Sequence, residues 1–117
     1  MRTIGIAVMV VWCATGVFSV AGAADGKMLF EQNCGTCHGA DGKGVQGLGK
    51  DLTASEFAIK KTDAELVAFI KEGRPADDPL NTTGILMPPN AGNPALTDDD
   101  LKSIVTHMRS LHAKKGS

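Results

Sequence analysis

The chain is 117 residues long and carries 12 lysine and arginine residues against 13 aspartate and glutamate residues, a formal net charge of −1. This length suits one small domain, and the near-neutral charge argues against a nucleic-acid-binding protein, which would present a basic surface. Aromatic residues make up only 4% of the chain, so a domain of this size has little apolar core of its own.

The first 23 residues are predicted to be a secretory signal peptide. Arg2 is followed by an apolar run from Ile4 through Val20 and then by Ala21-Gly22-Ala23, small residues that fit a cleavage site. The alternative is a membrane anchor, but the run is short for a span and is interrupted by polar and small residues. Because the leader resembles a bacterial one, we expect a periplasmic mature domain over residues 24–117, with a charge near −2 once Arg2 is removed.

The mature chain opens with a predicted helix from Asp25 to about Asn33, whose apolar residues include Met28, Leu29 and Phe30. Gly26 lies in its first turn, where glycine disfavours a helix. It either marks a close contact with another helix or belongs to a frayed end, and the residues alone leave both interpretations open.

The most informative motif follows directly. Cys34-Gly35-Thr36-Cys37-His38 is a C-x-x-C-H run, the attachment signature of a c-type haem. In such a site Cys34 and Cys37 form thioethers with the haem vinyl groups, and His38 binds the iron from one face. Export and haem attachment support one another, since c-type haem is generally joined to protein outside the energy-transducing membrane.

A bare C-x-x-C pair could instead be half of a zinc site or a thiol redox pair. A zinc site needs two further ligands, and the mature chain offers only His107 and His112 near its far end. A thioredoxin-like redox pair is expected in a βαβ context, and no alternating strand pattern is present. One covalently bound haem c is therefore the predicted cofactor.

Residues 39–52 contain five glycines and are predicted to form an irregular loop. A phosphate-binding loop is the alternative, but no Gly-Lys-Ser/Thr ending and no preceding strand support it. We expect this loop to run close to the haem and to offer a backbone carbonyl to Nδ1 of His38, which would fix the tautomer of that ligand.

Two further helices are indicated by their caps. Thr62 and Glu65 form a T-x-x-E capping box that opens a helix ending near Gly73. Thr97 precedes three aspartates, which suit the positive end of a second helix. The predicted buried faces are Leu66, Phe69 and Ile70 on the first helix, and Leu101, Ile104, Val105, Met108 and Leu111 on the second.

Between these helices, a long loop from Arg74 to Leu96 contains all five prolines of the chain. Long loops in small domains are usually functional. The tripeptide Met87-Pro88-Pro89 lies at its centre.

In this order of elements the chain resembles a class I c-type cytochrome, and the resemblance covers essentially the whole mature chain. It implies an all-α, small cytochrome c fold with three to five helices around one covalently attached haem. It also implies that Met87 is the second axial iron ligand, opposite His38, with the two prolines stiffening the loop. Met28 and Met108 are rivals in principle, but both lie on predicted apolar helix faces.

The chain departs from the family pattern at two positions. His107 stands where the last helix usually carries an aromatic residue, and Lys50 stands where many relatives carry a proline. We expect His107 and His112 to be packing or surface residues rather than ligands. The resemblance also places polar groups near the haem propionates, although plain solvation is an equal alternative for each of them: Arg74, Asn81, Thr82 and Thr83.

Iron held by histidine nitrogen and methionine sulfur has no open position, so the site favours change of oxidation state over bond chemistry. We therefore expect a monomeric one-electron carrier between redox protein partners, not an enzyme, with no nucleic acid or membrane partner. The alternatives are a haem subunit docked to a periplasmic dehydrogenase, and a gas-binding haem protein with open iron. Five lysines could ring the haem edge, although a scattered surface is the default expectation: Lys27, Lys43, Lys50, Lys60 and Lys61.

Overall fold

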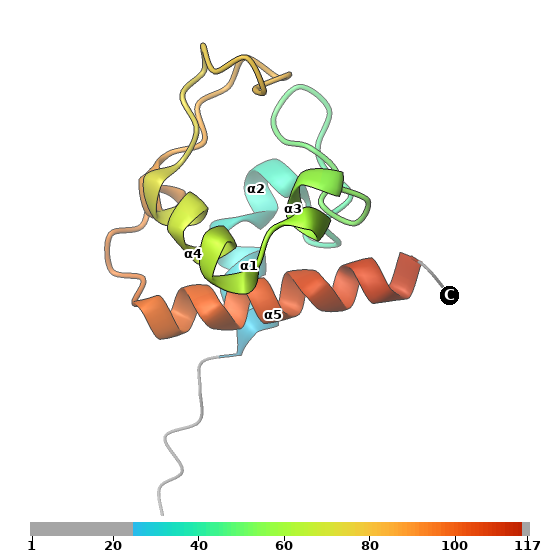
Figure 1. Ribbon diagram of the computed structural model, residues 1–117, viewed down its shortest axis with the longest axis vertical. Coiled ribbons are helices and arrows are strands. Elements are labelled where there is room, and N and C mark those ends of the chain that lie inside the picture. Colours follow the sequence, from blue (N-terminus) through green and yellow to red (C-terminus); the bar gives the residue numbers. More distant parts are fainter. Residues whose placement is uncertain (1–24, 116–117) are drawn as a thin grey trace, which may run out of the picture.

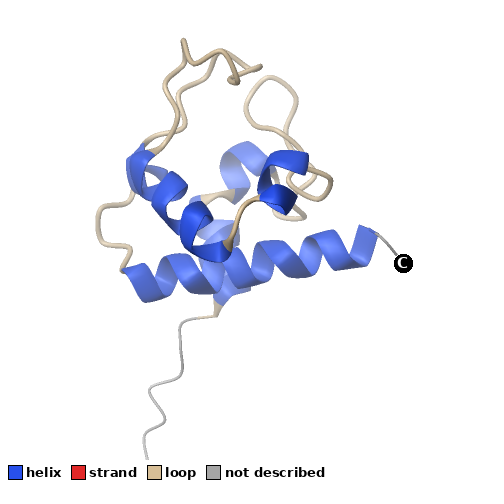
Figure 2. Cartoon of the chain, viewed as in Figure 1, coloured by secondary structure: helices blue, strands red, loops and turns tan. Residues whose placement is uncertain are grey.

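The computed structural model describes residues 25–115, so the predicted signal peptide lies outside the described residues (Figure 1). Within this range the structure is helical and contains no strand beyond the isolated bridges Val45–Gly49 and Arg74–Met87 (Figure 2). The all-α prediction is confirmed. The elements are α1 (Gly26–Asn33), α2 (Gly35–His38), α3 (Glu56–Lys60), α4 (Asp63–Glu72), the 3-10 turn η1 (Pro89–Gly92) and α5 (Asp98–Lys115).

The long helix α5 carries the core, and both α1 and α4 pack against it (Figure 1). The spacing of three and four residues along α5 places its apolar residues on one face, and the five predicted for that face are all buried. On α4, Val67 is buried with Leu66 and Ile70, whereas Phe69 is only half-buried and packs its ring against Phe57 of α3.

The crossing of α1 and α5 settles the interpretation of Gly26. A Cβ atom at Gly26 would lie 2.2 Å from the backbone oxygen of Ser103, so only glycine lets the two helices approach this closely. One turn further along, the rings of Phe30 and His107 are tilted against each other with centroids 5.3 Å apart. Gly26 therefore marks helix packing and not a frayed end.

One prediction about α1 is wrong. Met28 was expected on an apolar face, yet 54% of it is exposed, while Phe30 is fully buried against α5. Two residues correspond to about 200° of rotation around a helix, so Met28 and Phe30 point in opposite directions. With Phe30 on the α5 side, Met28 faces solvent.

The predicted caps are present. The hydroxyl of Thr62 accepts from the Glu65 backbone N–H at 3.2 Å and the Glu65 carboxylate accepts from the Thr62 N–H at 2.7 Å. Thr97 and Asp100 make the same reciprocal pair at the start of α5. The sequence motifs did not reveal α3, a five-residue helix that Ser55 caps.

The remaining chain forms the predicted loops. The segment 74–88 extends away from α5 (Figure 1), whereas the segment 39–55 also contacts α5, because Nε2 of His112 hydrogen-bonds to the Leu52 oxygen. Among the described residues, no helix is long and apolar enough to cross a membrane.

Candidate functional site

A cavity of about 420 Å³ lies between the α2 turn and the two long loops. Its volume falls within the range of small-molecule and cofactor pockets. The four residues predicted to bind the cofactor all line it: Cys34, Cys37, His38 and Met87. The structure thus brings together residues that are up to 53 positions apart in the chain.

The two cysteines are placed by a single helical turn. Cys34 ends α1 and also precedes α2, which contains Cys37 and His38. Burial, together with the neighbouring Cys37, raises the pKa of the Cys34 thiol to about 11. Cys34 is therefore protonated at neutral pH, unlike the low-pKa thiolate of a dithiol redox centre.

His38 is held by the glycine-rich loop. Its Nδ1 lies 2.9 Å from the backbone oxygen of Lys50, so Nδ1 carries the proton and donates, and Nε2 is left with its lone pair. The loop reaches this position through Gly49, because a Cβ there would lie 2.4 Å from the Cys37 oxygen. The prediction of a backbone acceptor for His38 is confirmed, with Lys50 as that residue.

Met87 is fixed through its backbone. Its N–H donates to the Arg74 oxygen at 2.9 Å, and its own oxygen accepts from the Arg74 N–H at 2.8 Å. This bridge ties the loop to the end of α4. The half-buried Met87 side chain packs against the core cluster and lines the same cavity as the residues of the α2 turn.

The guanidinium of Arg74 also belongs to the cavity wall. It lies 4.9 Å from the ring centre of Phe57 and 4.8 Å from that of Phe69, a cation–π arrangement. Its Nη1 donates to the Leu80 oxygen at 3.4 Å, whereas its buried Nε has no hydrogen-bond partner. A buried donor without a partner is uncommon in folded proteins.

The other polar groups predicted near propionates differ in their surroundings. Asn81 lines the cavity, but its amide nitrogen already donates to the oxygens of Pro75 and Ile85 within its own loop. Thr83 lines the cavity as well, and Thr82 is exposed and does not. The side chain of Asn81 thus mainly stabilises its own loop.

The two remaining histidines lie away from the cavity. His107 packs on Phe30, and burial together with the charges of Lys114 and Lys27 lowers its pKa below the ordinary value. His112 hydrogen-bonds through Nε2 to the backbone of Leu52. In residues 25–115 no group of three histidine, cysteine or acidic side chains is arranged to hold a metal ion, which gives the zinc alternative no support.

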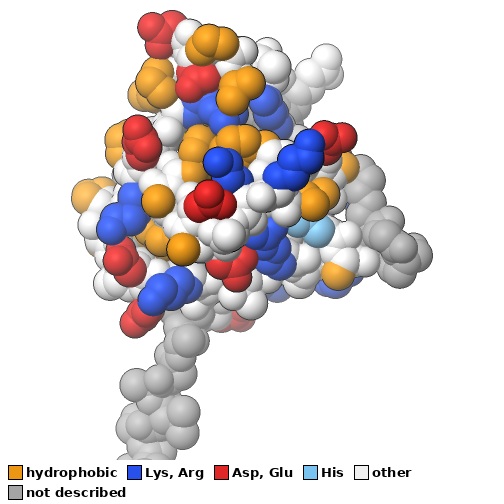
Figure 3. All heavy atoms as spheres, in the orientation of Figure 1, with side chains coloured by type: hydrophobic (Ala, Val, Ile, Leu, Met, Phe, Trp, Pro, Cys, Tyr) orange, Lys and Arg blue, Asp and Glu red, His pale blue; other side chains and the backbone are white. Residues whose placement is uncertain are grey.

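The lysines do not form a ring around the cavity. Of the five considered, only Lys50 lines it, while Lys27 and Lys43 line a separate groove beside α1 and α5. On the face shown in Figure 3, cationic and acidic side chains are interspersed. The cavity wall itself contains Lys50 and Arg74 but no carboxylate.

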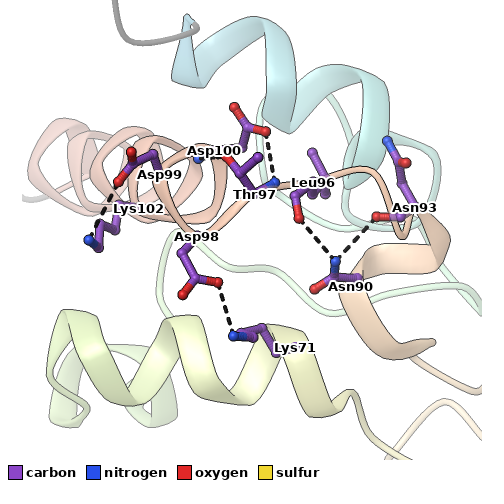
Figure 4. A network of polar contacts seen from close by, with 9 residues as sticks. All are labelled: Lys71, Asn90, Asn93, Leu96, Thr97, Asp98, Asp99, Asp100 and Lys102. Atoms are coloured by element: carbon purple, nitrogen blue, oxygen red, sulfur yellow. Dashed lines mark hydrogen bonds and ion pairs between the residues drawn. The ribbon is translucent and has the colours of Figure 1, made fainter.

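Two residues that line the cavity, Asn33 and Asn93, were not predicted from the sequence as parts of the site. Asn93, which follows η1, donates through Nδ2 to the Oδ1 of Asn33 at 2.9 Å. The two are 60 positions apart, and no short-range pattern predicts such a pair. Figure 4 shows Asn90, which lies in η1, and Asn93, which follows η1 in the connection to α5.

The family model for cytochrome c matches residues 23–112. The chain belongs to the cytochrome c family. Proteins of this family carry covalently bound haem c and generally transfer electrons, so the coarse prediction of a haem electron carrier is confirmed.

Similar proteins include both a small cytochrome and oxidase subunits. Cytochrome c-555 of Prosthecochloris aestuarii is 28% identical over 73% of this chain and 83% of its own length. The cbb3-type cytochrome c oxidase subunit FixP of Azorhizobium caulinodans is 34% identical over 76% of this chain, and subunit CcoP of an Azospirillum species is 30% identical over 83%. The chain spans only 27% and 32% of those two subunits. No solved structure gave a significant match.

The residues of this cytochrome fit a haem on three structural grounds. Two half-buried cysteines, an imidazole with a free Nε2 and a thioether side chain line one cavity. This donor set is that of a His/Met-ligated haem. The cationic residue Arg74 also lines the cavity, and its charge suits an anionic group such as a propionate.

Proposed function

We propose that this cytochrome is an exported, periplasmic one-electron carrier with a single haem c. Residues 1–23 act as the signal peptide and residues 24–117 form the cytochrome domain. Cys34 and Cys37 would hold the haem by thioether bonds, and His38 and Met87 would supply the two protein ligands of its iron. The observation that carries the proposal is that His38 and Met87, both fixed by backbone hydrogen bonds, line the same cavity.

The haem supplies an iron centre that gains and loses one electron, which no side chain of this protein can do. The protein residues define how that centre behaves. The Lys50 carbonyl keeps the proton on Nδ1 of His38, so Nε2 stays available as a ligand and the imidazole is a better donor. Met87, held by Arg74, fills the position that a substrate or gas would need.

The ligand pair also determines which oxidation state is favoured. A thioether ligand raises the reduction potential, and so does a cavity wall without carboxylates, because both disfavour the extra positive charge of ferric iron. Two cations in the wall, Lys50 and Arg74, act in the same direction. We therefore expect a potential suited to accepting electrons from a dehydrogenase or quinol-oxidising complex.

A second candidate function is a haem subunit docked to an oxidase or dehydrogenase. It is favoured by the similarity to the cbb3-type oxidase subunits, although the chain spans only about a third of their length or less. Free carrier and docked subunit share the same haem site. Size-exclusion chromatography of the native protein from a periplasmic extract separates them: a carrier elutes as a monomer, and a subunit elutes within a larger complex.

The experiment that tests the site is an optical spectrum of the oxidised and reduced holoprotein, with and without carbon monoxide, beside Met87→Ala. We expect the wild type to show the red-region band of ferric iron bound to sulfur and to resist carbon monoxide. Met87→Ala should lose the band and bind carbon monoxide readily. A band that survives the substitution would remove Met87 as the ligand.

A further inference from the structure

The segment that follows Met87 contains a strained turn. Asn90 and Ala91 have φ angles of 55° and 54°, and they are the only non-glycine residues with positive φ among those described. The left-handed region is unfavourable for residues with a Cβ atom, and more so for alanine than for asparagine. Contacts outside the turn must therefore maintain this conformation.

Side-chain amides provide those contacts. Nδ2 of Asn90 donates long hydrogen bonds to the backbone oxygens of Asn93, at 3.4 Å, and Leu96, at 3.3 Å (Figure 4). The backbone N–H of Asn93 in turn donates to the Asn90 oxygen at 3.0 Å. The turn thus places the side chain of Asn93 in a defined position.

Asn93 then links the turn to the first helix. Its Nδ2 donates to Oδ1 of Asn33, and Nδ2 of Asn33 donates to the Leu29 oxygen, both at 2.9 Å. Asn33 is the last residue of α1 and directly precedes Cys34. Both asparagines are half-buried and line the cavity. We call Asn33, Asn90 and Asn93 the asparagine clamp.

The Met87 loop is attached to the rest of the protein at two points, one at Met87 itself and one in the turn after it. On one side, the backbone bridge to Arg74 attaches Met87 to the end of α4. On the other side, the clamp attaches the turn after Met87 to the helix that carries the first cysteine. This side-chain pair directly joins the residue before Cys34 to the segment after Met87, and both residues line the cavity.

We propose that Asn33 and Asn93 are positioning residues that hold the Met87 sulfur at the iron opposite His38. This inference rests on the proposed function, because it requires Met87 to be an iron ligand. The clamp opposes movement of the Met87 loop away from the α2 turn. Without it, the methionine leaves the iron more readily while the helices stay packed.

The test uses holoprotein variants and follows two signals during denaturant titration, the red-region sulfur-to-iron band and far-UV helicity. In Asn93→Ala the band should disappear at lower denaturant than helicity, and carbon monoxide should bind the ferrous protein about tenfold faster, the effect of one lost partly buried hydrogen bond. Asn33→Ala removes the same bond from the other side, so either variant serves if one folds poorly. The double variant should add little, because both changes break one interaction.

A further variant separates positioning from general stability. Thr62→Ala removes the α4 cap and lowers stability far from the cavity, and its band and helicity should disappear together. The inference is overturned if Asn93→Ala behaves like Thr62→Ala with unchanged carbon monoxide binding. If Met87→Ala itself keeps the band, the proposed function fails and the clamp loses its role with it.

Discussion

At the scale of single residues, Lys50 stands where many relatives carry a proline, and it makes one contact through its backbone and another through its side chain. Its backbone oxygen accepts from His38, which a proline at this position could also do. Its side chain adds a hydrogen bond from Nζ to the Leu80 oxygen at 2.7 Å, which proline could not. The glycine-rich loop and the Met87 loop are therefore connected by Lys50 at the cavity mouth.

His107 allows a prediction about pH. Its folded-state pKa is lowered by burial first, then by Lys114 and Lys27, and Glu31 and Asp25 oppose the shift only in part. As pH falls through the ordinary histidine pKa of 6.5, the unfolded chain takes up a proton that the folded one resists, so the protein loses stability until the folded pKa is also passed.

The measurement is the free energy of unfolding at several pH values for the wild type and His107→Phe. The loss of stability from about pH 7 to 5 should be smaller in the variant, which retains the ring contact with Phe30 but does not titrate. His112 is present in both proteins, so its contribution cancels. Identical pH profiles would show that the α1–α5 contact does not disfavour the charged imidazole.

At the scale of elements, the helix pair α1 and α5 forms the platform for the site. The close approach at Gly26 positions α1, and the last residues of α1 lead directly into Cys34 and the α2 turn. A shift of α1 along α5 would therefore move the cysteines and Asn33 together. Packing on one side of the molecule determines the cavity on the other.

Gly26→Ala should destabilise the protein by about 2 kcal/mol. Alanine favours the helix by about 1 kcal/mol, but its Cβ would lie 2.2 Å from a backbone atom that cannot rotate away, and overpacking costs about 1–3 kcal/mol or more. Chemical denaturation measures the difference. Met28→Ala, at an exposed position of the same helix, is the control and should change stability little. A Gly26→Ala protein as stable as the wild type would mean that the helices are not in close contact.

At the scale of the whole molecule, the fold is divided into a packed side and a loop side. The buried apolar residues of the described chain are mostly on α1, α4 and α5, while the cavity walls consist largely of half-buried or exposed loop residues. Several of these are large and apolar: Leu48, Ile85 and Leu86. A domain of this size has little margin of stability without a group that buries these side chains.

The cofactor should therefore be required for folding. In the variant Cys34→Ala/Cys37→Ala, which cannot form thioethers, we expect most far-UV helicity to be lost at 25 °C, because burial of the loop side chains and the ligand bonds are both absent. Circular dichroism of the purified variant beside the holoprotein measures this. A variant with native helicity and a cooperative thermal transition would show that the α1–α4–α5 core is sufficient.

The sequence by itself determined the longer helices and the expected haem cofactor, because both depend on short-range patterns. A capping box predicted the start of α4, a threonine cap followed by three aspartates predicted the start of α5, periodicity predicted the buried face of α5, and C-x-x-C-H predicted the cofactor. Adjacent residues carry these signals, so no knowledge of the fold is needed to recognise them. The expectation for Met87 came from family resemblance together with its place in the loop.

The tertiary structure decided what depends on contacts between distant segments. It showed that Gly26 is a packing residue, that Met28 faces solvent, and that Asn33 meets Asn93. Each of these depends on which helix face turns toward α5 or on where a loop returns to the core. These contacts depend on the packing of the whole chain, so no pattern of neighbouring residues predicts them.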